Sequence, residues 1–180
     1  MRVHLVRHLA PLVAPGVCYG CTNIAVDLGL QARALPGLRA QLPQGVPVIS
    51  SPLRRCASLA SGLSDDVRFD ARLVELDFGR WEMQHWDAIP RAEIDAWAAD
   101  VALYQPGDGE SVLDMAHRIA AFYDDLVREA APEVVLVCHA GTIRLMSARQ
   151  RGLDPADMAR EAAQHPHAIG YGEIVVLDCV

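Results

Sequence analysis

The sequence predicts an α/β fold with a mostly parallel sheet, because short apolar runs alternate with helix-like patterns along the 180 residues. Four runs rich in β-branched residues are predicted strands, at residues 3–6, 46–49, 134–137 and 174–177. Helical patterns lie between them, an order that is typical of parallel crossovers, and we place the last strand at or near a sheet edge. No repeat, linker or low-complexity segment divides the chain. We therefore expect one domain over residues 1–180.

The first two helices are predicted from apolar spacing and from their start signals. Residues 31–42 carry apolar side chains at helical spacing, although a proline and a glycine within the segment weaken its boundaries. A second helix is predicted to open at Ser51-Pro52, with the serine as cap and the proline at the first helical position, and to run to about Leu63. Arg55 then falls in its first turn.

Two further helices are predicted in the second half of the chain. Residues 94–101 are amphipathic, and residues 112–126 carry the longest stripe of apolar side chains at helical spacing. Ser111 followed by Asp114 resembles a capping box for the longer helix. His117 lies within that helix, and we expect it to be a packed or surface histidine rather than a catalytic one.

Composition and charge exclude several classes of function. All 16 basic residues are arginine, and they face 23 acidic residues, for a net charge of −7. This balance argues against nonspecific nucleic-acid binding, which relies on clustered cations. No apolar run approaches the length of a membrane span, and residues 1–6 are too short for a secretory signal, so we expect a cytoplasmic protein without a membrane partner. A homodimer stays open as its assembly.

The five cysteines are expected to be reduced thiols, since their number is odd and no export signal precedes them. Cys18 and Cys21 have C-x-x-C spacing, and His165 and His167 could complete a zinc tetrad. However, no second cysteine pair exists, and the two histidines flank a proline in a predicted loop. We therefore expect neither a metal nor another cofactor.

Polar side chains stand at the carboxyl ends of three predicted strands. Arg7 and His8 follow the first strand, Ser50 and Ser51 the second, and His139 the third. Because the carboxyl ends of parallel strands meet in the crevice where open α/β sheets bind ligands, we expect these side chains to converge. An imidazole beside a guanidinium is suited to holding a phosphate.

These residue types fit phosphoryl transfer, which needs an in-line nucleophile, cations around the phosphate oxygens and an acid for the leaving group. A neutral His8 offers one ring nitrogen with a free lone pair while its other N–H makes an orienting hydrogen bond. Arg7 and Arg55 are predicted to disfavour the imidazolium and to clamp the phosphate. The small-residue turn at residues 140–142 feeds a helix whose free amide groups suit an oxyanion. Such a site requires no metal.

The chain carries four motifs at these element boundaries: Arg7-His8, Ser51-Pro52-Leu53-Arg54-Arg55, Leu73-Val74-Glu75-Leu76-Asp77-Phe78-Gly79 and His139-Ala140-Gly141. In this order they resemble the histidine phosphatase superfamily, also called phosphoglycerate-mutase-like, over nearly the whole chain. The resemblance implies a three-layer sandwich with helices on both faces of the sheet. It also implies His8 as phosphohistidine nucleophile, Arg7 and Arg55 as phosphate clamps, His139 as the second pocket histidine and Glu75 as proton donor.

Within that superfamily, residues 14–20, 78–83 and 107–111 resemble the α-ribazole-5′-phosphate phosphatases of cobalamin nucleotide-loop assembly. The resemblance implies that the substrate is a small-molecule phosphate monoester, α-ribazole 5′-phosphate, and that water is the final acceptor. Three alternatives stay open: a broad-specificity small-molecule phosphatase, a phosphoglycerate-mutase-type phosphotransferase, and a non-catalytic phosphoester-binding protein.

The proton donor is chosen among three nearby carboxyl groups. Asp77 and Glu82 compete with Glu75, but the match to Leu-x-Glu before Phe-Gly selects Glu75. A carboxyl group donates a proton near pH 7 only if burial or a nearby negative charge raises its pKa, and a bound phosphate would supply that charge.

Other residues are expected at the rim of the site. Tyr19 and Thr142 are candidate substrate contacts, and the three tryptophans Trp81, Trp86 and Trp97 are expected to pack, although one could touch an aromatic substrate.

Leu9 stands where the superfamily most often has glycine. We expect its side chain to narrow the pocket mouth or to tilt the backbone, at the expense of a backbone amide contact to phosphate, while His8 keeps its place.

Overall fold

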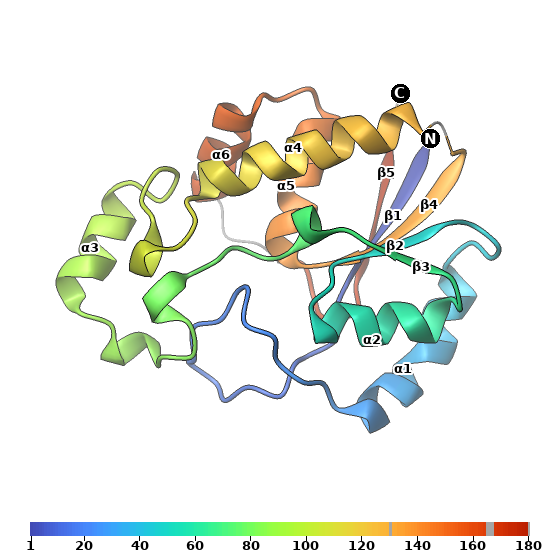
Figure 1. The fold of residues 1–180 in the computed structure, drawn as a ribbon, viewed down its shortest axis with the longest axis horizontal. Coiled ribbons are helices and arrows are strands. Elements are labelled where there is room, and N and C mark those ends of the chain that lie inside the picture. The colour runs from blue at the N-terminus through green and yellow to red at the C-terminus, as the bar shows by residue number, and fades with distance from the viewer. Residues whose placement is uncertain (130, 165–167, 180) are drawn as a thin grey trace.

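The computed structural model describes residues 1–129, 131–164 and 168–179, and the strands within them form one sheet of order β3-β2-β4-β1-β5 (Figure 1). The strands, in chain order, are β1 (Arg2–Arg7), β2 (Val48–Ser50), β3 (Val67–Phe69), β4 (Glu133–Cys138) and β5 (Ile174–Asp178). The pairs β1–β4, β2–β4 and β2–β3 are parallel, whereas β5 pairs antiparallel with β1 at the sheet edge. The predicted α/β class, the mostly parallel sheet and the edge position of the last strand are confirmed.

Two strands depart from the sequence prediction. β3 was not predicted, because it has only three residues and its central Arg68 is exposed, so no apolar run marks it. β5 runs antiparallel rather than through a parallel crossover. The chain enters β5 beside the carboxyl end of β1, where the Arg7 amide donates to the Glu173 carbonyl over 3.0 Å. From that end it pairs with β1 by running in the opposite direction.

The helices form the two outer layers of a three-layer sandwich (Figure 1). One face of the sheet is covered by α1 (Leu28–Gln41) and α2 (Arg54–Leu63), and the other by α4 (Val112–Arg128), α5 (Ala140–Gln150) and α6 (Pro155–Gln164). α3 (Arg91–Ala99) lies beyond the sheet, at the left of Figure 1. Short 3-10 turns lie at Ala71–Leu73, Gly79–Trp81, Trp86–Ala88 and Pro106–Asp108. The layers implied by the family resemblance are confirmed, and α6 is a helix that the sequence analysis missed.

The buried side chains of β1 explain why both faces of the sheet are covered. Val3 and Leu5 pack with Ile119 of α4, whereas Val6, on the other face, packs with Leu59 of α2. Successive strand residues point to opposite faces, so an apolar run such as that of β1 is buried on both sides. The same arrangement holds the carboxyl end of β1 in the interior.

The serine cap predicted for α2 does not form. The helix begins at Arg54 with Leu53 at its N-cap, so Pro52 lies outside the helix. The Ser51 hydroxyl instead lies 2.9 Å from Nε2 of His139, at the end of β4. The Ser51 hydroxyl therefore contacts His139 in the crevice and does not cap α2.

The remaining helix boundaries follow their caps. α1 begins earlier than predicted because the Asp27 carboxylate accepts from the amides of Gly29 and Leu30, the second and third residues of the helix. α3 ends at Ala99, so Val101 lies outside it. The predicted capping box is confirmed at α4: the Ser111 hydroxyl accepts from the Asp114 amide, and the Asp114 carboxylate accepts from the Ser111 amide, each over 3.1 Å.

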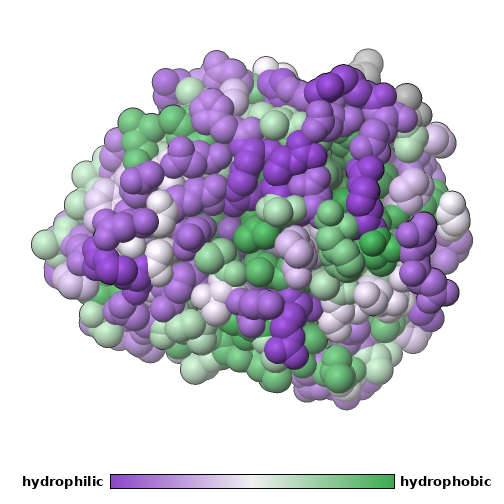
Figure 2. All heavy atoms as spheres, in the orientation of Figure 1, coloured by the Kyte–Doolittle hydropathy of each residue, from purple (hydrophilic) through white to green (hydrophobic). Residues whose placement is uncertain are grey.

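The surface agrees with the amphipathic pattern of α4. Its apolar stripe is buried and His117 is exposed, as expected for a surface histidine. Hydrophilic residues cover the upper part of the face seen in Figure 2, where α4 lies. Within the described part of the chain, no helix combines the length and the apolar character needed to cross a membrane.

We predict that Ser111→Ala destabilises the protein by about 1 kcal/mol, because it removes the hydroxyl that accepts from the Asp114 amide in the capping box. Urea unfolding followed by circular dichroism measures this change. The matched control is Ser147→Ala, which removes a hydroxyl bonded to the Ile143 carbonyl inside α5 and is expected to change the free energy of unfolding by at most roughly 0.5 kcal/mol. Equal losses in the two variants would contradict a capping role for Ser111.

Candidate active site

Three strand ends meet at one place in the sheet. His8 follows β1 and His139 follows the neighbouring β4, and the His8 amide donates to the Cys138 carbonyl over 3.0 Å. The two imidazole rings lie edge to face, with centroids 5.1 Å apart. Ser51, at the end of β2, joins them through its contact to His139. The structure thus brings these predicted residues together, as the topology of parallel strands requires.

The His8 ring is held in one tautomer by the backbone. Its Nδ1 lies 2.7 Å from the carbonyl oxygen of Leu9, and since that oxygen only accepts, Nδ1 carries the proton and Nε2 keeps a free lone pair. Burial lowers the pKa of His8 to about 3, with Arg55 and Arg7 acting in the same direction, although the Leu9 hydrogen bond acts against them. The imidazole is therefore neutral at physiological pH.

The Arg55 guanidinium is held by backbone carbonyls alone. Its side chain is completely buried in the first turn of α2, as predicted, whereas its neighbour Arg54 is exposed. Its terminal nitrogens donate to the carbonyls of Thr22 and Gly20, and its Nε has no partner among the described residues. No carboxylate of the described chain forms an ion pair with it.

Arg7 is held in a similar way on the other side of His8. One terminal nitrogen donates to the Ile169 carbonyl, and the guanidinium lies 4.0 Å from the centre of the Tyr171 ring, a cation–π contact. Its Nε is buried without a partner, and within the described ranges it too forms no ion pair. Two positive charges thus flank a neutral imidazole, and neither forms an ion pair within the described part of the chain.

His139 lies behind His8 rather than on the cavity wall. It is completely buried, and Cys56 Sγ lies 3.5 Å from its Nε2, beside the Ser51 contact. Burial, followed by the nearby Arg55, lowers the pKa of His139 well below its usual value. The neutral ring packs against His8, and a contact from His139 to substrate stays a prediction.

Glu75 faces the same cavity as His8 and is fixed at the start of α5. Its Oε1 accepts from the Leu76 amide and its Oε2 from the Gly141 amide, each over 3.1 Å. A Cβ on Gly141 would lie 2.2 Å from Glu75 Oε1, so the glycine permits the close approach of the carboxyl group. The Gly141 amide was expected to be free for an oxyanion, but in this structure it binds Glu75. The carboxyl group occupies the place of an anion at the helix N-terminus.

The competing carboxylates lie elsewhere. Asp77 lines a separate hollow of about 440 Å³ on the far side of Glu75, and Glu82 binds the backbone at residues 20–22. Neither is among the described residues that line the His8 cavity.

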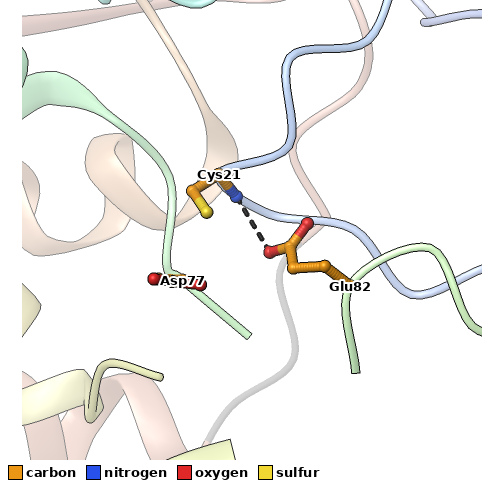
Figure 3. A group of neighbouring side chains, drawn as sticks. All are labelled: Cys21, Asp77 and Glu82. Atoms are coloured by element: carbon orange, nitrogen blue, oxygen red, sulfur yellow. Dashed lines mark hydrogen bonds between the residues drawn. The ribbon is translucent and has the colours of Figure 1, made fainter. Parts of the chain in front are cut away.

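Cys21, Asp77 and Glu82 place ligand-type atoms within 4.8 Å of one another (Figure 3). The donor set does not suit a metal, because both Glu82 oxygens already accept backbone amides and burial raises the pKa of the Cys21 thiol to about 12. The alternative zinc tetrad with Cys18 includes His165 and His167, which lie outside the described residues.

Charged and aromatic side chains both line the cavity beside His8. It encloses about 410 Å³, and its polar lining includes Arg7, His8, Arg55, Glu75 and Arg144. Its apolar lining includes Leu76, Phe78, Trp86, Trp97, Val112 and Met115, and Tyr19 lies on the wall near Arg55. The indoles of Trp86 and Trp97 are stacked, with centroids 5.8 Å apart and planes 10° apart. They pack as expected, and both also line the cavity, whereas Trp81 is buried and donates to Glu93.

Tyr19 lies at the cavity wall, as predicted, and it pairs with a residue that the sequence analysis missed. Its hydroxyl lies 2.7 Å from that of Tyr171, and its ring lies 5.5 Å from the Arg55 guanidinium. The Tyr171 ring covers Arg7 and lies 5.6 Å from the His8 ring. Two hydrogen-bonded tyrosines therefore cover the two arginines. No local pattern marks Tyr171, because its role depends on a partner 152 positions away.

Thr142 and Leu9 stabilise the fold and do not line the cavity with their side chains. The buried Thr142 hydroxyl donates to the Leu73 carbonyl over 3.2 Å, and its side chain is not among the described cavity-lining groups. The Leu9 side chain is buried in the core on the α1 and α2 side, so the expectation that it narrows the pocket mouth is wrong. Its backbone is unstrained, and its carbonyl orients His8.

Known proteins with this architecture include several phosphatases. A putative α-ribazole-5′-P phosphatase from Escherichia coli superposes with a TM-score of 0.81 at 26% identity, over 98% of this chain and 89% of that one. The α-ribazole phosphatase of Shigella flexneri superposes with a TM-score of 0.83 at 24% identity, over 99% and 90% of the two chains, a likeness of fold. A putative phosphoserine phosphatase 2 of Hydrogenobacter thermophilus is 29% identical over 153 residues, which are 79% of this chain and 74% of that protein.

The family comparison covers most of the site. The model of the histidine phosphatase superfamily (branch 1) matches residues 27–172, a range that contains Arg55, Glu75 and His139. Arg7 and His8 precede that range, and their place beside it rests on the geometry described above. The sandwich architecture and the length of this match lead to one conclusion: the chain belongs to the histidine phosphatase superfamily.

Proposed function

We propose that the protein is a phosphomonoester hydrolase that works through a phosphohistidine at His8 and needs no metal. The observation that carries this proposal is the neutral imidazole, with its Nε2 lone pair free, between the buried guanidinium of Arg55 and the half-buried guanidinium of Arg7, which lack a carboxylate partner among the described residues. Guanidinium forks match phosphate oxygens and keep their charge. A phosphate dianion would offset the charges of Arg7 and Arg55.

The first half-reaction transfers the phosphoryl group to His8. Nε2 attacks phosphorus, the bond to the leaving oxygen breaks, and a protonated Glu75 gives its proton to that oxygen. Arg7 and Arg55 hold the remaining phosphate oxygens, and the Leu9 carbonyl stabilises the positive ring through Nδ1–H. The phosphate charge near Glu75 favours the protonated carboxyl group before transfer.

The second half-reaction returns the enzyme to its starting state. The Glu75 carboxylate takes a proton from water, the water oxygen attacks phosphorus, and the bond to Nε2 breaks. Inorganic phosphate leaves, His8 is neutral and Glu75 is protonated again.

The proposed substrate is α-ribazole 5′-phosphate, in cobalamin nucleotide-loop assembly. Its flat aromatic base suits a cavity whose lining includes Phe78 and the stacked pair Trp86 and Trp97. The α-ribazole phosphatases among the structural neighbours support the same substrate. A small polar phosphoester such as 3-phosphoglycerate would leave this aromatic wall without a partner, which disfavours the mutase alternative.

The test compares phosphate release from α-ribazole 5′-phosphate, phosphoserine, 3-phosphoglycerate and an aryl phosphate. We expect the highest kcat/KM with α-ribazole 5′-phosphate and no transfer of phosphate between the hydroxyls of phosphoglycerate. His8→Ala should lower kcat/KM by at least about 10³-fold, because the nucleophile is lost. His117→Ala, which changes an exposed histidine outside the site, should match the wild type.

Each contrary result removes a different part of the proposal. Equal rates in His8→Ala and wild type would remove the nucleophile. Equal kcat/KM values for all substrates would favour a broad-specificity phosphatase, and phosphate binding without turnover would favour a non-catalytic protein.

Glu75→Gln tests the proton donor through the leaving group. We expect the rate of phosphoryl transfer to His8 to fall roughly 10²-fold or more with an alkyl phosphate, whose alkoxide is a poor leaving group, and much less with a nitrophenyl phosphate. Single-turnover release of the alcohol or nitrophenol, which reports the first half-reaction alone, measures both. Asp77→Asn is the matched control, since Asp77 neighbours Glu75 in sequence but lines the other hollow, and it should affect both substrates alike. Equal losses on both substrates in Glu75→Gln would contradict its role as acid.

A further inference from the structure

We propose that Glu82 is a positioning residue that holds Arg55 in place through the loop at residues 20–22. The inference rests on the proposed function, in which Arg55 binds the phosphate. Glu82 is not among the described residues that line the cavity, and it binds the loop through backbone amides and the Thr22 hydroxyl.

The Glu82 carboxylate binds the whole loop. It accepts from the Cys21 amide over 3.0 Å (Figure 3). It also accepts from the Gly20 amide over 3.0 Å, from the Thr22 amide over 3.1 Å and from the Thr22 hydroxyl. A further bond comes from the Phe78 amide over 3.0 Å. Hydrogen bonds to a carboxylate are shorter and stronger than those between neutral groups. The side chain therefore fixes three consecutive peptide units against the turn that follows Glu75.

The same loop binds Arg55 from its other side. The carbonyls of Gly20 and Thr22, two residues whose amides bind Glu82, accept from the two terminal nitrogens of the guanidinium. The loop thus lies between a carboxylate and a guanidinium, donating to the first and accepting from the second. A shift of the loop would move both contacts that set the plane of the guanidinium fork.

This indirect arrangement explains how Arg55 can be fixed and still attract an anion. A carboxylate bound directly to Arg55 would neutralise the charge that the phosphate needs. Neutral carbonyls orient the guanidinium without removing its charge. The Glu82 carboxylate, in turn, accepts hydrogen bonds from the loop amides instead of pairing with Arg55. Arg55 is completely buried, and its described hydrogen bonds all go to the carbonyls of Gly20 and Thr22.

The test is a double-mutant cycle read out by binding of inorganic phosphate. We expect Glu82→Gln to weaken phosphate binding by roughly tenfold, because the amide of glutamine removes one acceptor oxygen and faces the loop N–H groups. In an Arg55→Met background, the same change should alter binding by less than about twofold, since no guanidinium remains to be oriented. Isothermal titration calorimetry on the intact chain gives all four dissociation constants.

Two further variants separate positioning from stability. Glu93 accepts from the indole of Trp81, the residue before Glu82, and does not bind the loop. Glu93→Gln should therefore leave phosphate binding unchanged, whatever its effect on thermal unfolding. Thr22→Val removes one donor to Glu82 and supplies the same cycle if Glu82→Gln does not fold. It should weaken phosphate binding by roughly threefold, again only when Arg55 is present.

Additive effects of the changes at Glu82 and Arg55 would overturn the inference and leave the proposed function intact. Unchanged phosphate binding in Glu82→Gln or, if that variant does not fold, in Thr22→Val would do the same. A wild-type protein that binds no phosphate would overturn both, and the separate assay of phosphate release would then show whether any turnover remains.

Discussion

The structure around the site depends on two guanidinium charges, Arg55 buried and Arg7 half-buried, that have no carboxylate partner among the described residues. A buried charge is costly unless polar groups surround it, and here backbone carbonyls supply those groups. Gly20 and Thr22 bind Arg55, while Ile169 binds Arg7. Loops from distant parts of the chain are thereby tied to the carboxyl edge of the sheet. In the proposed function, the remaining positive charge beside the neutral imidazole binds the oxygens of the phosphate.

The negative groups near the site are arranged so that they do not cancel this charge. Glu82 binds amides of the loop behind Arg55, and Glu75 binds the Gly141 amide at the start of α5. The arginines are instead covered by the rings of Tyr19 and Tyr171, which attract a cation without carrying charge. The site therefore combines fixed arginine charges with a cover of aromatic rings. Electrostatic stabilisation of phosphoryl transfer is largest where such charges are held in place and water is excluded.

The parts of this account that sequence predicts are those set by local pattern. The apolar run before His8 places it at a strand end, and the spacing from Ser51 separates the buried Arg55 from its exposed neighbour. Long-range contacts are not visible in such patterns, so Tyr171 and the role of Glu82 were missed. The expectation that Leu9 narrows the pocket mouth was wrong for a related reason. The sequence does not tell which way a side chain points after the end of a strand, and Leu9 points into the core. β3 was not predicted because its three residues are partly or fully exposed and form no apolar run.

The central claim is that the ring nitrogen of His8 bonds transiently to phosphorus. Rapid quenching during turnover of ³²P-labelled substrate, followed by peptide mapping under alkaline conditions, tests it most directly. The account predicts an acid-labile, base-stable label on His8 that forms before phosphate is released and decays at the rate of turnover. Release of phosphate without a labelled protein, or a label on His139 instead, would contradict it.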